Sequence, residues 1–150
     1  MIIAFFGLFA CKSKENATGD TTDAAKSTTN NGVIKGVLSD EPLDENAIGD
    51  KFVVEGARME GNLLMVDIQY SGGCKKHEFS VIGSNAIAKS LPPIRSILIK
   101  HNANEDHCRA LIKQTLMIDA REFAYKKEEG SEIYLVVNGV KGRVLFKYSK

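Results

Sequence analysis

Tryptophan is absent from this sequence, and cysteine and histidine each occur only three times in 150 residues. Three cysteines are far below the density of a scaffold held together by disulfides. Positive charge is not in excess either, because 20 lysine and arginine residues face 19 acidic ones. Proteins that bind nucleic acid usually carry a clear basic excess, so we expect no nucleic-acid partner. A chain of this length suffices for one domain that folds without a covalent or metal staple.

A long hydrophobic run is also missing, since the strongly apolar stretch at the start covers only residues 1–10. A helix of ten residues rises about 15 Å, roughly half the hydrocarbon core of a membrane, which excludes a transmembrane helix here. A short apolar stretch that ends in small residues is instead typical of a secretory signal. We therefore expect residues 1–10 to be a signal peptide.

Cys11 directly follows this stretch, and the run Leu8-Phe9-Ala10-Cys11 resembles the lipobox of bacterial lipoproteins. That motif has an aliphatic residue three positions before the cysteine and a small residue immediately before it. The resemblance implies cleavage before Cys11, a diacylglycerol on its thiol and acylation of the new amino group. Several acyl chains give stable anchoring. We expect a protein of the bacterial cell envelope that is lipid-anchored through Cys11, and the alternative is a chance cysteine after an apolar N-terminus.

The segment after Cys11 has no large apolar residue. Residues 12–32 contain no leucine, isoleucine, valine, methionine or aromatic residue. Such a stretch cannot bury enough apolar surface to offset the entropy of ordering it, so we expect disorder. A flexible coil of this length spans about 25 Å. Residues 11–32 are thus predicted to be a lipidated cysteine followed by a tether.

The rest of the chain, residues 33–150, is predicted to be one all-β domain. Apolar residues alternate with polar ones in many short runs, as in Leu64, Val66 and Ile68, and Gly, Asn and Pro separate the runs. About seven strands at this spacing favour an antiparallel β-sandwich, of which the immunoglobulin-like fold is one form. At most two short helices are expected, at residues 84–90 and at 104–114, the second with Asn104 as its N-cap.

Two cysteines remain once Cys11 is assigned to lipid, and all three histidines lie between them in the sequence. The members of this window are Cys74, His77, His101, His107 and Cys108. The first interpretation is a disulfide between Cys74 and Cys108, because an exported protein meets an oxidising compartment. The bond would stabilise the fold by about 3–4 kcal/mol in the chain-entropy model.

The second interpretation is a zinc site formed by Cys74, His77, His101 and Cys108. Two thiolates and two imidazoles are a common tetrahedral zinc set, and the Cys-x2-His spacing lets one turn supply two ligands. The strand alternation places His77 on the face of Phe79 and also turns His101 inward. The plain alternative for both histidines is an imidazole at the edge of the core that bonds to backbone, and for His107 simple exposure.

The third interpretation is catalysis by a cysteine–histidine pair with Asp106 or Glu105 orienting the ring. No known nucleophile motif is present, and no glycine-rich phosphate loop stands between a strand and a helix. We therefore expect no enzyme and no catalytic residue.

The stretch from Tyr70 to Cys108 resembles a group of uncharacterised bacterial lipoproteins. The likeness rests on YSGGCKKHEF, KSLPP and LIKHNANEDHC, with a Gly-Gly-Cys-x2-His-x-Phe turn and a later His…Cys segment. It implies an envelope protein of unassigned activity and carries over no catalytic residue. We expect a membrane-anchored lipoprotein with a structural or binding role and no cofactor. Zinc binding is the alternative and an enzyme a distant third.

Overall fold

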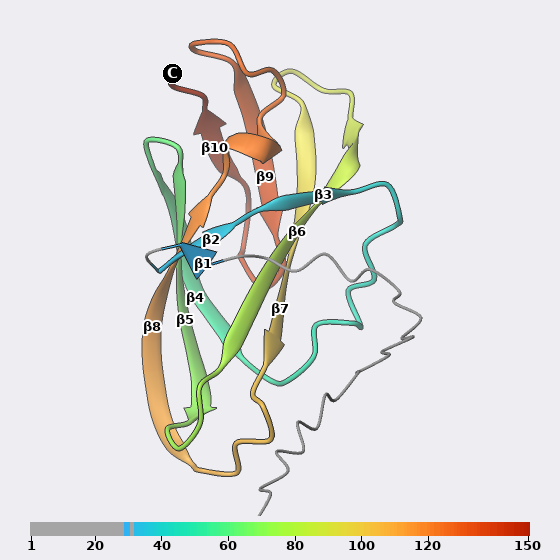
Figure 1. Ribbon diagram of the computed structural model, residues 1–150. Coiled ribbons are helices and arrows are strands. Elements are labelled where there is room, and N and C mark those ends of the chain that lie inside the picture. Colours follow the sequence, from blue (N-terminus) through green and yellow to red (C-terminus); the bar gives the residue numbers. More distant parts are fainter. Residues whose placement is uncertain (1–28, 31) are drawn as a thin grey trace, which may run out of the picture.

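The computed structural model describes residues 29–30 and 32–150, which form a sandwich of two five-stranded sheets (Figure 1). The predicted signal peptide, Cys11 and most of the predicted tether lie outside these residues. In spatial order, the first sheet contains β1 (Thr29–Asn30), β2 (Val33–Lys35), β8 (Ala110–Asp119), β5 (Leu63–Gly72) and β4 (Val53–Glu60). The second contains β10 (Val144–Lys147), β9 (Glu132–Val137), β7 (Ile94–Asn102), β6 (Glu78–Ala88) and β3 (Val37–Ser39).

The alternating pattern correctly predicted the all-β sandwich and its core. Leu64, Val66 and Ile68 of β5 have no exposed surface, whereas the residues between them are partly exposed. Apolar side chains of β6, β7 and β9 meet them from the second sheet. The fully buried members there include Val81, Ile99, Ile133 and Leu135. The core is thus built from the period-two faces of both sheets.

The sheets are mixed, whereas the sequence favoured purely antiparallel ones. The pairs β2–β8, β3–β6 and β7–β9 are parallel, and the other described pairs are antiparallel. β2 and β3 are each three residues long and are separated only by Gly36. One extended segment therefore leaves the first sheet at Gly36 and joins the second. Strands this short leave no alternation long enough to read from the sequence.

Neither segment predicted as a helix is one. Residues 84–88 belong to β6, residues 104–109 form the β7–β8 connection, and β8 follows. Asn104 and Glu105 have φ of 51° and 56°, which a right-handed helix does not allow. Leu111, which a helix would have buried, is 61% exposed. The only helical element in the described part is the 3-10 turn η1 (Arg121–Phe123), and no helix there is long and apolar enough to span a membrane.

Phe123 of η1 fills the place where the chain changes sheets. Its side chain is fully buried, and a Cβ atom built on Gly36 would overlap its ring. A Cβ atom on Gly83 would lie 2.8 Å from ring atom Cδ1. Buried Arg95 also contacts η1, since its Nε donates to the Phe123 carbonyl over 3.0 Å. Gly36 is therefore required for packing and not for an unusual φ angle.

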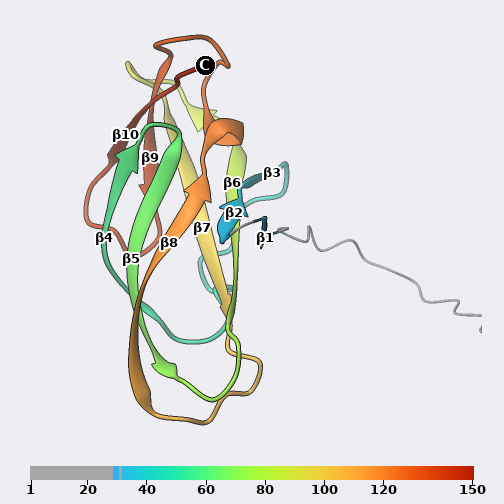
Figure 2. The same ribbon diagram turned by 60° about the vertical axis from the view of Figure 1, so that its left-hand side comes forward.

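One end of the sandwich collects three connections. The β5–β6 and β7–β8 connections both pass from one sheet to the other at the lower end in Figure 1, away from the C-terminus. The β3–β4 connection reaches the same region, because Gly49 bridges to His101 near the end of β7. This end, seen at the bottom of Figure 2 as well, carries all the cysteines and histidines of the described residues.

Replacing Gly36 by alanine is expected to destabilise the domain by about 1–3 kcal/mol, because the new methyl group must displace the Phe123 ring. Urea denaturation measures the loss. Gly56→Ala is the matched control: a Cβ atom there meets nothing within 4 Å, so stability should stay the same or rise slightly. Equal stabilities of the two variants would contradict the assigned packing.

Candidate functional site

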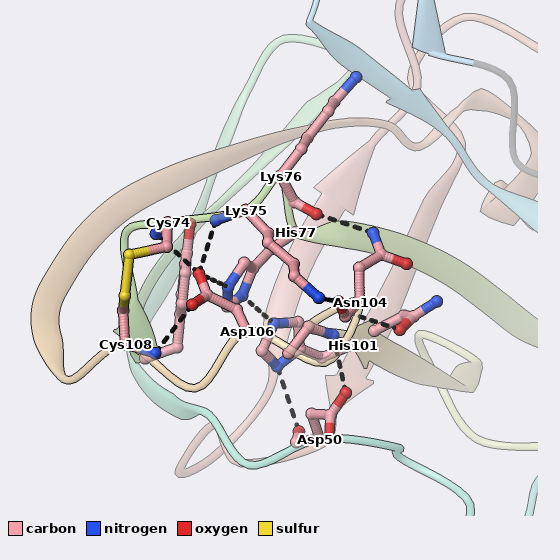
Figure 3. Close-up of polar contacts among 12 residues, drawn as sticks. Asp50, Cys74, Lys75, Lys76, His77, His101, Asn104, Asp106 and Cys108 are labelled. Atoms are coloured by element: carbon pink, nitrogen blue, oxygen red, sulfur yellow. Dashed lines mark hydrogen bonds and ion pairs between the residues drawn. A yellow bond between two sulfur atoms is a disulfide. The ribbon is translucent and has the colours of Figure 1, made fainter.

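The predicted disulfide is present and joins the two connections that cross between the sheets. Cys74 lies on the β5–β6 connection and Cys108 on the β7–β8 connection, with 5.9 Å between their Cα atoms (Figure 3). Cys74 is exposed and Cys108 is partly buried. One crossover runs from the first sheet to the second and the other runs back. The bond therefore ties both sheets together at this end.

Asp106 ties the same two connections together without a covalent bond. Its Oδ2 accepts the backbone N–H groups of Cys74 and Lys75, each over 2.9 Å, and its Oδ1 accepts that of Cys108 over 2.9 Å. His77 Nε2 lies 3.2 Å from Oδ2. The carboxylate side chain has no exposed surface. The N–H groups of Lys75 and then Cys108 hold the pKa of Asp106 far below its usual range, because they stabilise the ionised form.

Two histidines continue from Asp106 into the domain. His77 Nδ1 lies 2.8 Å from His101 Nε2, and His101 Nδ1 lies 3.2 Å from the backbone oxygen of Asp50. The His77 side chain is 2% exposed and His101 is 3% exposed. Burial lowers the pKa of His101, since the charged ring loses its hydration. We call this row of groups, from Asp106 through His77 and His101 to the Asp50 carbonyl, the histidine row (Figure 3).

Aromatic rings cover the histidine row. The Tyr70 ring stacks on His77 with 4.5 Å between centroids, and the Phe79 ring lies parallel to His101 at the same distance. Phe52 meets His101 edge-on at 5.7 Å. Burial, and secondarily the charge of Asp106, raises the pKa of Tyr70, whose hydroxyl donates to Gln114 over 3.0 Å. The row thus lies in an aromatic box that shields it from water.

A strained turn directs Asp106 inward. Asn104 and Glu105 both adopt left-handed φ angles, an uncommon conformation for residues other than glycine. The Asp106 N–H donates to the Ala103 carbonyl over 3.0 Å. Asn104 is held from the other connection, because its amide donates to the Lys76 carbonyl over 2.7 Å and its carbonyl accepts from Lys75 Nζ over 2.9 Å. These contacts keep the turn in place.

The sulfurs and the histidines do not converge as a zinc set. The group whose ligand atoms lie within 4.8 Å of one another is Cys74, Asp106 and Cys108. Its sulfurs are bonded to each other, which argues against a metal at this position. Both ring nitrogens of His101 already have partners, His77 and a backbone oxygen. His101 therefore matches the plain alternative of a core-edge imidazole bonded to backbone.

The catalytic interpretation is met in one respect only. Asp106 does contact His77, whereas Glu105 and His107 are exposed. Within residues 32–150 no thiol faces the ring, because Cys74 and Cys108 are joined in the disulfide.

The sequence analysis did not place Asp50, Phe52 or Tyr70 in the site, and it used Phe79 only to mark the face on which His77 lies. It also missed the bonds from Asp106 to Cys74 and Lys75. One local signal was available, since an aspartate two residues before Cys108 is placed to accept its N–H in an Asx turn. The bonds that cross more than thirty residues of sequence had no such signal.

No family model matches the chain, and no curated protein matches it. Similar solved structures include a NigD-like immunity protein from Bacteroides caccae, at 18% identity and a TM-score of 0.50, covering 69% of this chain and 50% of that one. Another is a protein of unknown function from Bacteroides vulgatus, at 16% identity and a TM-score of 0.52, covering 79% and 57%. The chain thus spans 50% and 57% of the length of these two proteins, and such low identity shows a shared fold alone.

Replacing both Cys74 and Cys108 by alanine is expected to cost about 4 kcal/mol of unfolding free energy, the chain-entropy value for a sequence separation of 34. The variant should still fold, because Asp106 continues to join the two connections. Chemical denaturation measures the loss. As a control, the native chain purified without reductant should gain about two hydrogen masses on reduction. Two free thiols with one bound zinc ion would contradict the disulfide.

Proposed function

We propose that the protein is a lipid-anchored protein of the bacterial cell envelope whose domain has a structural or binding role and no catalytic one. The anchor is the acylated Cys11 that the lipobox-like run Leu8–Cys11 predicts, and the segment between Cys11 and β1 is its tether. The domain carries no cofactor. Its ligand, a protein or a small molecule, binds to the outside of the sandwich and not within the cysteine–histidine site.

The closure of the cysteine–histidine site carries this proposal. A catalytic group must be reached by its substrate, yet the side chains of His77 and Asp106 are 2% and 0% exposed. Each of their polar atoms already has a partner within the domain. No buried side-chain nitrogen or oxygen lacks a partner in residues 32–150. A fully satisfied, closed network supports a structural role.

The disulfide supports the proposed localisation in the bacterial cell envelope. Disulfides persist in exported proteins and are rare in the reducing cytosol. An Asp106 oxygen lies within 4.8 Å of both sulfurs, and a carboxylate so close disfavours a second negative charge there. A reduced thiol at this position would therefore be a poor nucleophile. Low nucleophilicity agrees with a structural disulfide and not with a cysteine that acts in redox or hydrolytic catalysis.

Zinc binding is the second candidate, because the ligand atoms of Cys74, Asp106 and Cys108 gather within 4.8 Å. It requires both sulfurs in the reduced form. It ranks below the disulfide, since the sulfurs are joined and Asp106 already accepts three backbone N–H groups and contacts His77.

Replacing Cys11 by alanine tests the anchor. The full chain produced in a bacterium that processes lipoproteins should incorporate a labelled fatty acid and partition into the detergent phase of a Triton X-114 extract. The Cys11→Ala variant should do neither, because it lacks the only thiol that acyl transfer uses.

The double variant of Cys74 and Cys108 is the matched control, since it keeps Cys11 and should be labelled like the native chain. Labelling of Cys11→Ala, or an unlabelled native chain, would contradict the proposed anchor. Rapid alkylation of native Cys74 or Cys108 at neutral pH would contradict the non-catalytic role.

A further inference from the structure

The histidine row begins and ends with a group that only accepts hydrogen bonds. One end is the backbone oxygen of Asp50 and the other is the ionised carboxylate of Asp106. Between them lie three contacts, of 3.2, 2.8 and 3.2 Å. Each neutral imidazole supplies one N–H, so two neutral histidines supply two protons for three contacts. One contact would then bring two lone pairs together.

Burial makes this mismatch expensive. The Asp106 and His77 side chains are 0% and 2% exposed, and His101 is 3% exposed, so water does not supply the missing donor. A buried acceptor without a donor loses the full hydration free energy of that group. One added proton on the pair removes the mismatch. Its positive charge then lies 3.2 Å from the Asp106 carboxylate and against the rings of Tyr70 and Phe79, which attract a cation.

We propose that His77 and His101 form a proton-binding site, which holds one proton beyond those of two neutral rings and locks the three connections at this end of the domain. This inference does not depend on the proposed anchor or on any bound ligand. The proton is shared across the 2.8 Å contact between His77 Nδ1 and His101 Nε2.

The surrounding charges favour one added proton and oppose a second. Asp106 faces the pair from the β7–β8 connection, and Asp50 faces it from the β3–β4 connection. Tyr70 on β5 is un-ionised, and the Lys75 ammonium group is turned to the Asn104 carbonyl. A second proton would set two N–H groups against each other across 2.8 Å. The lowered pKa of His101, caused first by burial, agrees with a histidine pair that binds one added proton and not two.

Loss of the shared proton would loosen contacts that the disulfide does not replace. The disulfide joins the β5–β6 and β7–β8 connections, whereas the histidine row also reaches the β3–β4 connection. Asp50 holds that third connection in place. Its N–H donates to the His101 carbonyl over 2.9 Å, and its Oδ2 accepts the Ala103 N–H over 2.7 Å. Deprotonation of the pair is expected to free the β3–β4 connection first.

The unfolding equilibrium of the full chain, measured from pH 5 to 8, tests the site. In the unfolded chain, the two histidines together bind two added protons well below about pH 6.5 and none well above it. The folded pair keeps one throughout, so unfolding becomes more favourable on both sides of a stability maximum near pH 6.5. The limiting change is tenfold in the unfolding constant per pH unit, about 1.4 kcal/mol.

A loss of stability below pH 6.5 would follow from any buried neutral histidine. The change in stability above pH 6.5 therefore decides whether the pair holds the added proton. His107→Gln is the matched control, because His107 is exposed and lies outside the row, and its profile should not change. Stability that is flat or rises between pH 6.5 and 8 would overturn the proposal.

Nitrogen-15 NMR of the histidine rings gives a second, independent measurement. At pH 7, three of the four ring nitrogens of His77 and His101 should carry a proton. In Asp106→Asn the side-chain amide can donate to His77 Nε2, so the count should fall to two. A purely structural carboxylate would leave the count unchanged. Two protonated nitrogens in the native chain would overturn the proposal whether or not the variant folds.

Discussion

The buried carboxylate of Asp106 is the interaction on which this end of the domain depends. It accepts three backbone N–H groups and faces one imidazole, and these partners come from both connections that cross between the sheets. Without it, the N–H groups of Cys74 and Lys75 would lose the acceptor that joins them to the β7–β8 connection. The disulfide joins the same two connections covalently. Each link keeps the other in register.

A closed site at the end of a sandwich explains why the most chemically distinctive residues of the chain do not indicate an activity. Cys74, Cys108 and His77 are the residue types of zinc sites and nucleophiles, yet here their reactive atoms bind one another or Asp106. Their chemistry is used to hold three connections together. Under the proposed binding role, a ligand would contact the sheets and loops outside this closed end. The proposal of a tethered binding domain agrees with this arrangement.

The sequence was informative where one pattern repeats along a strand and uninformative where contacts are distant. Alternation in β5 correctly identified Leu64, Val66 and Ile68 as core, and the inward turn of His101 followed from the same rule. The helix predicted over residues 104–114 was wrong, because Asn104 resembles an N-cap but is held in a left-handed turn by contacts to the β5–β6 connection. The Cys74–Cys108 pairing followed from counting thiols, whereas the bonds of Asp106 to Cys74 depend on tertiary structure alone.

Amide hydrogen exchange at residues 74, 75 and 108 tests most directly whether the carboxylate organises this end. It is measured in Asp106→Ala with the disulfide intact and in the double alanine variant of Cys74 and Cys108 with Asp106 intact. If Asp106 is the organising group, protection of the three amides is lost in the first variant and largely kept in the second. Protection that survives in Asp106→Ala and disappears with the disulfide would contradict this account.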